Sequence, residues 1–103
     1  MATVEVAFAA DHPAARGHFP GNPIIPGALL LSEALRAMES DFGNKSLAGH
    51  LKSAKFTHPV RPGDRVSIDF SVRGDKVVRF RCAVGGTTVL AGELVCEVLP
   101  KAD

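Results

Sequence analysis

The chain has 103 residues, of which 46% are apolar and 22% charged, and its 12 basic and 11 acidic side chains give a formal net charge of +1. This length suits a single domain spanning residues 1–103, because about 100 residues can bury a core without metal or disulfide support. The near-neutral charge excludes a dedicated nucleic-acid binder. No stretch approaches the roughly 18 apolar residues of a membrane span. The N-terminus lacks a basic start followed by an apolar run, so we expect a cytoplasmic protein without a signal peptide.

The first half of the chain predicts one strand, one irregular loop and one long helix. Residues 3–9 alternate apolar and other side chains, which is typical of a strand. Residues 11–26 hold four prolines and two glycines, a density that neither a helix nor a central strand tolerates. A helix is then expected from Gly27 to about Ser40, entered through Pro26. Residues 28–31 are apolar on every side, so we expect the first turns of this helix to be buried all round.

The second half predicts four strands joined mostly by tight turns. A strand is expected over residues 51–57, and alternating patterns predict three more over residues 65–73, 78–84 and 90–98. Gly74-Asp75 and Gly85-Gly86 are typical hairpin turns. This order of elements predicts an α+β fold with an antiparallel sheet and one buried helix. A curved antiparallel sheet wrapped around one central helix, the hot-dog fold, fits well, and another α+β sheet-and-helix domain is the alternative. Since a short sheet exposes two edges, we expect a homodimer that covers one edge of each copy.

The two cysteines, Cys82 and Cys96, lie on the two strands that flank the turn at Gly85-Gly86. Mirror pairing about that turn places Cys82 near Val89 and Cys96 near Asp75. The thiols are then too far apart along the sheet to form a disulfide. We therefore expect two free, packed thiols, which is consistent with a reducing compartment.

The segment before the helix carries the groups that favour chemistry. His18 lies in a loop stiffened by proline and glycine, and a neutral imidazole can accept a proton near pH 7. Gly27 follows Pro26 at the helix start, where backbone N–H groups lack an intrahelical partner and can bind an oxyanion. A base and such donors are what proton removal beside a thioester carbonyl needs. The alternative is a loop histidine with a purely structural role.

Two motifs make this chemistry more specific. The segment HFPGNPIIPGALLL, which begins at His18, resembles the active-site motif of 3-hydroxyacyl-ACP dehydratases of the FabA/FabZ type. Residues 55–64, KFTHPVRPGD, are similar to a proline-glycine turn of the same enzymes. Both motifs occur in the expected order, on the expected helix and strand. The chain therefore resembles the 3-hydroxyacyl-ACP dehydratases, which have the hot-dog fold.

The resemblance implies an enzyme of fatty-acid biosynthesis that removes water from 3-hydroxyacyl thioesters to give trans-2-enoyl thioesters. His18 is then the base and Gly27 the oxyanion donor, and Phe19, Pro26 and Ala28 are the neighbouring substrate-binding residues of the motif. The substrate is carried by the phosphopantetheine of acyl carrier protein, or by coenzyme A. The active site is shared between the two copies of a homodimer. No metal, cofactor, nucleic acid or membrane is expected.

The sequence departs from the resembling family at its second catalytic position. Those enzymes carry Asp or Glu where this chain has Ser32, and Glu33 comes next. One residue is about 100° of helix rotation, so a regular helix turns Glu33 away from that position. Glu33 then has a plain alternative role, an ion pair with Arg36 on the outer face.

Three interpretations of Ser32 and Glu33 remain open. The site has lost its acid, which leaves a weak dehydratase or a non-catalytic acyl-thioester binder that needs a complete homologue. Alternatively, a one-residue bulge brings Glu33 into the catalytic position. In the third interpretation the site catalyses a different reaction of thioesters, such as hydrolysis, and the chain is a hot-dog thioesterase.

The remaining signals are weaker. His12, His50 and His58 do not occur at metal-ligand spacings, so we expect no metal site. Five basic side chains cluster in sequence around the two motifs and could receive an acidic carrier protein, although an ordinary solvated surface explains them as well. They are Arg16, Lys52, Lys55, Arg61 and Arg65.

Overall fold

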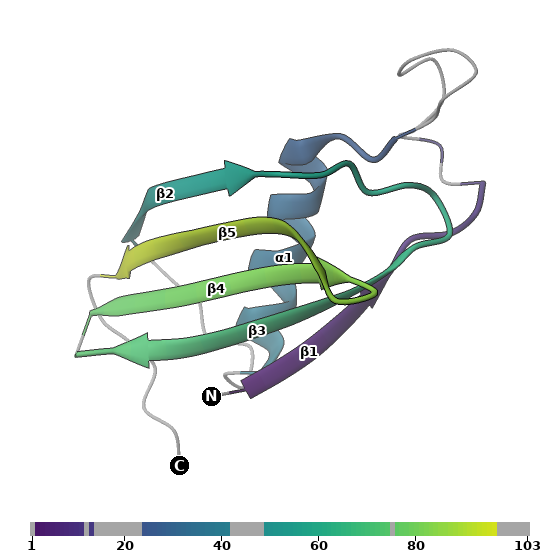
Figure 1. Cartoon of the computed structure of the whole chain (residues 1–103). Coiled ribbons are helices and arrows are strands. Elements are labelled where there is room, and N and C mark those ends of the chain that lie inside the picture. The colour runs from purple at the N-terminus through teal and green to yellow at the C-terminus, as the bar shows by residue number, and fades with distance from the viewer. Residues whose placement is uncertain (1, 12, 14–23, 42–48, 75, 97–103) are drawn as a thin grey trace.

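The computed structural model describes residues 2–11, 13, 24–41, 49–74 and 76–96, which form one sheet and one helix. The elements are β1 (Ala2–Ala7), α1 (Gly27–Asp41), β2 (Gly49–Phe56), β3 (Arg65–Arg73), β4 (Val77–Val84) and β5 (Thr87–Cys96). The strands pair antiparallel in the order β1-β3-β4-β5-β2. The helix crosses one face of the sheet and starts near the end of β2 (Figure 1). The predicted α+β architecture is confirmed.

The central strands follow the alternating pattern of the sequence. In β3, Val66, Ile68 and Phe70 are buried against the helix, while the residues between them face the opposite side. The turn between β4 and β5 has positive φ angles at both Gly85 (55°) and Gly86 (85°). A two-residue hairpin with both central residues in this region is the primed type that suits the twist of paired strands. The predicted hairpin is thus confirmed.

The helix buries one narrow row of side chains, and the expectation that its first turns are buried all round is wrong for the single chain. Leu30, Ala34 and Met38, spaced four residues apart, are at most 4% exposed. The row on the opposite side is exposed in full and comprises Ala28, Ser32, Arg36 and Ser40. The sheet covers only one side of the helix cylinder, so an apolar sequence around the whole circumference cannot be buried within one chain.

Both cysteines are buried and free, as expected. Cys82 pairs with Leu90 and the Cys96 N–H donates to the Lys76 carbonyl at 2.7 Å, so each lies one residue from its expected neighbour. A register shift between Cys82 and Ala83 accounts for the offset. Burial, with a smaller contribution from the Asp69 carboxylate, raises the pKa of Cys82 from the ordinary 9.0 to about 12. Burial also raises the pKa of Cys96.

The edge strand β2 is the most exposed strand of the sheet. Every residue in it except Ala54 is exposed, including Leu51 at 40% and Phe56 at 48%. An edge strand with exposed apolar side chains is a surface that proteins usually cover. The part of the chain that the structure describes contains no helix long and apolar enough to cross a membrane.

Candidate active site

The two sequence motifs meet at the start of α1. The Ile25 N–H donates to the Val60 carbonyl at 2.7 Å, and these two residues form an isolated antiparallel bridge. Both side chains are buried, at 3% and 1% exposure. This bridge holds the segment before the helix against the segment after β2, so Gly27 lies beside the Phe56 ring.

The helix begins with backbone donors that no described side chain caps. The Pro26 carbonyl accepts from the N–H groups of Leu29 at 3.0 Å and Leu30 at 3.1 Å. Among the described residues, the N–H groups of Gly27 and Ala28 have no acceptor, and the first turn contains no acidic residue. Unpaired N–H groups at the positive end of a helix stabilise an oxyanion. Of the two residues, Gly27 lacks a side chain that would cover its own N–H.

An open pocket of about 320 Å³ lies beside these donors. Its apolar wall consists of Ile24, Ile25, Leu30, Phe56, Pro59 and Val60, and Gly27, Thr57 and His58 complete the lining. A Cβ atom at Gly27 would lie 3.1 Å from a carbon of the Phe56 ring, so glycine is what leaves space at this end. An apolar pocket with backbone donors at one end can hold an acyl group by its carbonyl.

The polar end of the pocket is organised by one carbonyl oxygen. The Thr57 hydroxyl donates to the Thr88 carbonyl at 2.6 Å, and His58 Nδ1 lies 3.1 Å from the same oxygen. A carbonyl only accepts, so Nδ1 carries a proton and donates to it, and Nε2 is the remaining ring nitrogen. The sequence placed His58 in the second motif and away from metal-ligand spacings, but assigned it no role in the site. Its place inside the second motif was the signal that could have singled it out.

Three of the predicted site residues lie together at the helix start. Pro26 and Gly27 are half-buried at the helix start and Ala28 is exposed beside them. His18 and Phe19 lie outside the described residues, so their roles stay predictions. The backbone N–H of Gly27 and the pocket are therefore the described part of the predicted site.

Ser32 and Glu33 both lie away from the pocket lining in the single chain. Ser32 is exposed, in the outer row of the helix. The Glu33 carboxylate lies 3.9 Å from an Arg36 guanidinium nitrogen, and the Glu33 side chain is 29% exposed. The helix is α-helical at every residue from Gly27 to Asp41, so the bulge that would rotate Glu33 is absent from it. The plain alternative, a Glu33–Arg36 ion pair one turn apart, matches this geometry.

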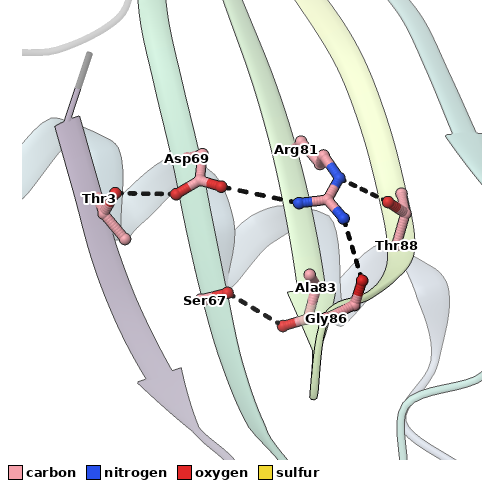
Figure 2. Close-up of polar contacts among 7 residues, drawn as sticks. All are labelled: Thr3, Ser67, Asp69, Arg81, Ala83, Gly86 and Thr88. Carbon is pink, nitrogen blue, oxygen red and sulfur yellow. Dashed lines mark hydrogen bonds and ion pairs between the residues drawn. The ribbon is translucent and has the colours of Figure 1, made fainter.

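A larger hollow, of about 510 Å³, lies on the opposite face of the sheet, away from the helix start. Four of its five charged lining side chains form ion pairs with one another. Asp69 accepts from the Thr3 hydroxyl at 2.8 Å and pairs with Arg81 at 3.7 Å, as Figure 2 shows. Arg79 pairs with Glu93 at 3.4 Å. Cross-strand pairs of this kind stabilise a solvated sheet face, so this hollow has an adequate structural explanation. Among the described residues, no three His, Cys, Asp or Glu side chains cluster as metal ligands.

Comparison with known proteins assigns the family. Residues 1–93 match the family model described as ApeI-like, ApeI dehydratase. A 3-hydroxyacyl-[acyl-carrier-protein] dehydratase FabZ of Campylobacter jejuni is 36% identical over 100 residues, covering 82% of this chain and 68% of the relative. A FabZ of Haemophilus influenzae is 33% identical over 95 residues, covering 84% of this chain and 63% of the relative.

Solved structures agree on the fold. The dehydratase heterocomplex ApeI:P of Xenorhabdus doucetiae gives a TM-score of 0.76 at 18% identity, covering 92% of this chain and 86% of that one. An (R)-hydratase of A. caviae gives 0.67 at 22% identity, covering 95% and 93%. The fluoroacetyl-CoA thioesterase FlK gives 0.67 at 13% identity, covering 96% and 84%. The chain therefore belongs to the ApeI-like and FabZ-like 3-hydroxyacyl-[acyl-carrier-protein] dehydratases, hydro-lyases with the hot-dog fold.

Proposed function

We propose that this chain removes water from 3-hydroxyacyl thioesters with His18 as the base and the Gly27 N–H as the donor to the thioester oxygen. The observation that supports this most is the helix start. N–H groups that no described residue caps lie beside an apolar pocket of about 320 Å³, on the helix that follows the histidine motif. Pro26 and Ala28 flank these groups, and Phe19 is proposed as a further substrate-binding residue from the motif alone.

The chemistry needs both parts of this proposal. Removing the proton next to a thioester carbonyl moves negative charge onto the carbonyl oxygen. Donors that are already aligned with that oxygen stabilise the enolate, and each such donor contributes about 10²–10³ in rate. The base must accept the α-proton, and a neutral imidazole can do so near pH 7. The apolar wall of the pocket would hold the first carbons of the acyl chain.

The substrate carrier is proposed from the relatives, whose names specify acyl carrier protein. Lys52, Lys55, Arg61 and Arg65 are exposed on and after β2. Complementary charge on this side would steer an acidic carrier towards the helix start. Coenzyme A carries the same phosphopantetheine arm and is the alternative carrier. The two free, buried thiols are typical of a reducing compartment, so we propose the cytoplasm as the location.

We further propose a homodimer that joins the β2 edges of two copies. Leu51 and Phe56 expose 40% and 48% of their surface on this edge, and covering them would remove apolar area from water. Phe56 also contacts the position of Gly27, so a partner on this edge would lie next to the pocket. The active site would then be shared between the two copies.

A second candidate function follows from Ser32. A homodimer presents serine at this position in both copies, and a hydroxyl is no general acid near neutral pH. The chain would then be a weakly active or non-catalytic acyl-thioester binder, and a homologue would supply the missing carboxylate. The related ApeI:P structure is a heterocomplex, which favours this candidate over a thioesterase.

Hydration of an enoyl thioester, the reverse reaction, tests the proposal. The purified chain is mixed with trans-2-enoyl thioesters on acyl carrier protein and on coenzyme A, and loss of the conjugated absorbance is followed. We expect hydration by the wild type and none by His18→Ala. Losing a general acid costs about 10²–10⁴ in rate, so the enzyme concentration must be high enough to detect that handicap. No hydration on either carrier would leave the binding function as the better account.

A further inference from the structure

The pocket beside Gly27 contains one titratable side chain among its described lining residues, His58. The remaining side chains there are apolar, apart from Thr57, whose hydroxyl donates to the Thr88 carbonyl. A titratable group at the polar end of an otherwise apolar pocket is a candidate for contact with substrate.

The ring of His58 is oriented by its backbone contact. Nδ1 lies 3.1 Å from the Thr88 carbonyl oxygen, which also accepts from Thr57. The carbonyl stabilises the N–H at Nδ1 in both the neutral and the protonated ring, because each form carries a proton there. Nε2 is therefore the ring nitrogen left to meet a substrate, and among the described residues no hydrogen bond or ion pair occupies it. Histidines that work as acids or bases are commonly oriented through their second nitrogen in this way.

The site also lacks another described acid. Ser32 has no acidic proton to give near neutral pH, and it lies in the exposed row of the helix. Glu33 is paired with Arg36 at 3.9 Å. Because two copies of one chain share these residues, a homodimer adds no carboxylate at position 32. A proton for the departing hydroxyl then comes from the base, from solvent or from another group near the pocket, and His58 is the titratable group that the described lining offers.

We propose that His58 is a catalytic residue that donates the proton from Nε2 to the departing 3-hydroxyl. This inference rests on the proposed dehydratase function. The base takes the α-proton, and its electron pair forms the double bond between the α- and β-carbons as the C–O bond breaks. The oxygen keeps the electron pair of that bond, takes the proton from the His58 imidazolium and leaves as water. His58 becomes neutral, the base holds one proton, and exchange with solvent restores both groups.

Two substitutions separate proton donation from substrate contact. His58→Asn keeps an amide N–H near the Thr88 carbonyl and removes the group at Nε2. His58→Gln places an amide near the Nε2 position, where it can hold the hydroxyl without supplying a proton. We expect both variants to lower kcat for hydration by about 10²-fold or more, the usual contribution of a general acid. For His58→Gln, KM should remain within about threefold of the wild type.

Chemical rescue gives a readout that a structural role would not produce. Added imidazole should restore part of the kcat of His58→Ala, because it can enter the open pocket and donate a proton. Thr57→Val is the matched control. It removes the neighbouring hydrogen bond to the same carbonyl, so it should reproduce any loss that comes only from loosening this turn. Denaturant unfolding of every variant checks that each is folded.

The outcomes distinguish this inference from the proposed function. A wild type that hydrates enoyl thioesters while His58→Gln keeps kcat within threefold overturns the role of His58 and leaves the dehydratase intact. A rise in KM alone in both variants, or equal losses in Thr57→Val, also overturns it. A wild type with no hydration on either carrier contradicts the proposed function itself, and the role of His58 with it.

Discussion

Substituting Gly27 by alanine separates the chemistry of the helix start from its stability. The new Cβ would lie 3.1 Å from one carbon of the Phe56 ring and 3.3 Å from two others. These distances are shorter than ordinary contacts, so the ring must move by a few tenths of an ångström. The ring is half exposed and can do so. Alanine also favours a helix over glycine by up to about 1 kcal/mol, so we expect the free energy of unfolding to change by no more than about 1 kcal/mol.

The effect on activity should be much larger. The added methyl group would fill the space between Gly27 and the Phe56 ring, at the end of the pocket where the thioester oxygen is expected. Loss of one oxyanion donor costs about 10²–10³ in kcat. We therefore expect Gly27→Ala to lower kcat/KM for enoyl-thioester hydration by about 10²-fold or more.

The assay pairs steady-state hydration kinetics with urea unfolding of the same preparations. Gly74→Ala is the matched control, since Gly74 has a positive φ of 65° and a Cβ there would meet nothing within 4 Å. That control should lose about 1 kcal/mol of stability, because alanine is strained in this region, and keep its activity. Activity of Gly27→Ala within threefold of the wild type would refute the oxyanion role of Gly27.

Three further results are expected. Ser32→Glu should raise the hydration rate about 10-fold or more if position 32 is a vacant acid site, whereas Glu33→Gln should change it less than threefold because its carboxylate pairs on the helix. Burial raises the pKa of Cys82 from 9.0 to about 12, so between these pH values the thiol is ionised in the unfolded chain and protonated in the folded protein. The free energy of unfolding therefore falls as the pH rises from 9.0 to about 12. Relative to Cys82→Ala, the wild type should lose about 1.4 kcal/mol between pH 8 and pH 10 by urea unfolding, and parallel pH profiles would contradict the burial argument. Gly92→Ala should unfold the protein or cost several kcal/mol, since its Cβ would fall against the Ser53 carbonyl oxygen, and a melting temperature near that of the wild type would show that this contact is wrong.

The elements of the fold were predictable because local patterns fix them. The helix was expected from Gly27 to about Ser40, from its entry at Pro26 and the good helix formers that follow, and it ends at Asp41. The hairpin at Gly85-Gly86 follows from residues that tolerate positive φ. The one-residue offset at Cys82 was not predictable, because a register shift depends on how β4 and β5 settle against each other.

The site was predictable only where a motif carries it. Gly27 was identified from the Pro-Gly pair at the helix start, and the structure confirms that pair's place there. The His58 contact with Thr88 joins residues 30 positions apart, so neither periodicity nor local spacing could indicate it. The exposure of Ala28 was also beyond the sequence, since an apolar run does not say which side the sheet covers. Long-range packing decides both features.

The most direct test of the central claim is mass spectrometry of a 3-hydroxyacyl thioester on acyl carrier protein incubated with the purified chain. We expect the wild type to remove one water from the acyl group until the hydroxyacyl and enoyl forms reach equilibrium. With His18→Ala, the acyl group should stay unchanged. An acyl group that remains intact with the wild type at high enzyme concentration, or that is released from the carrier as free acid, would contradict the dehydratase account.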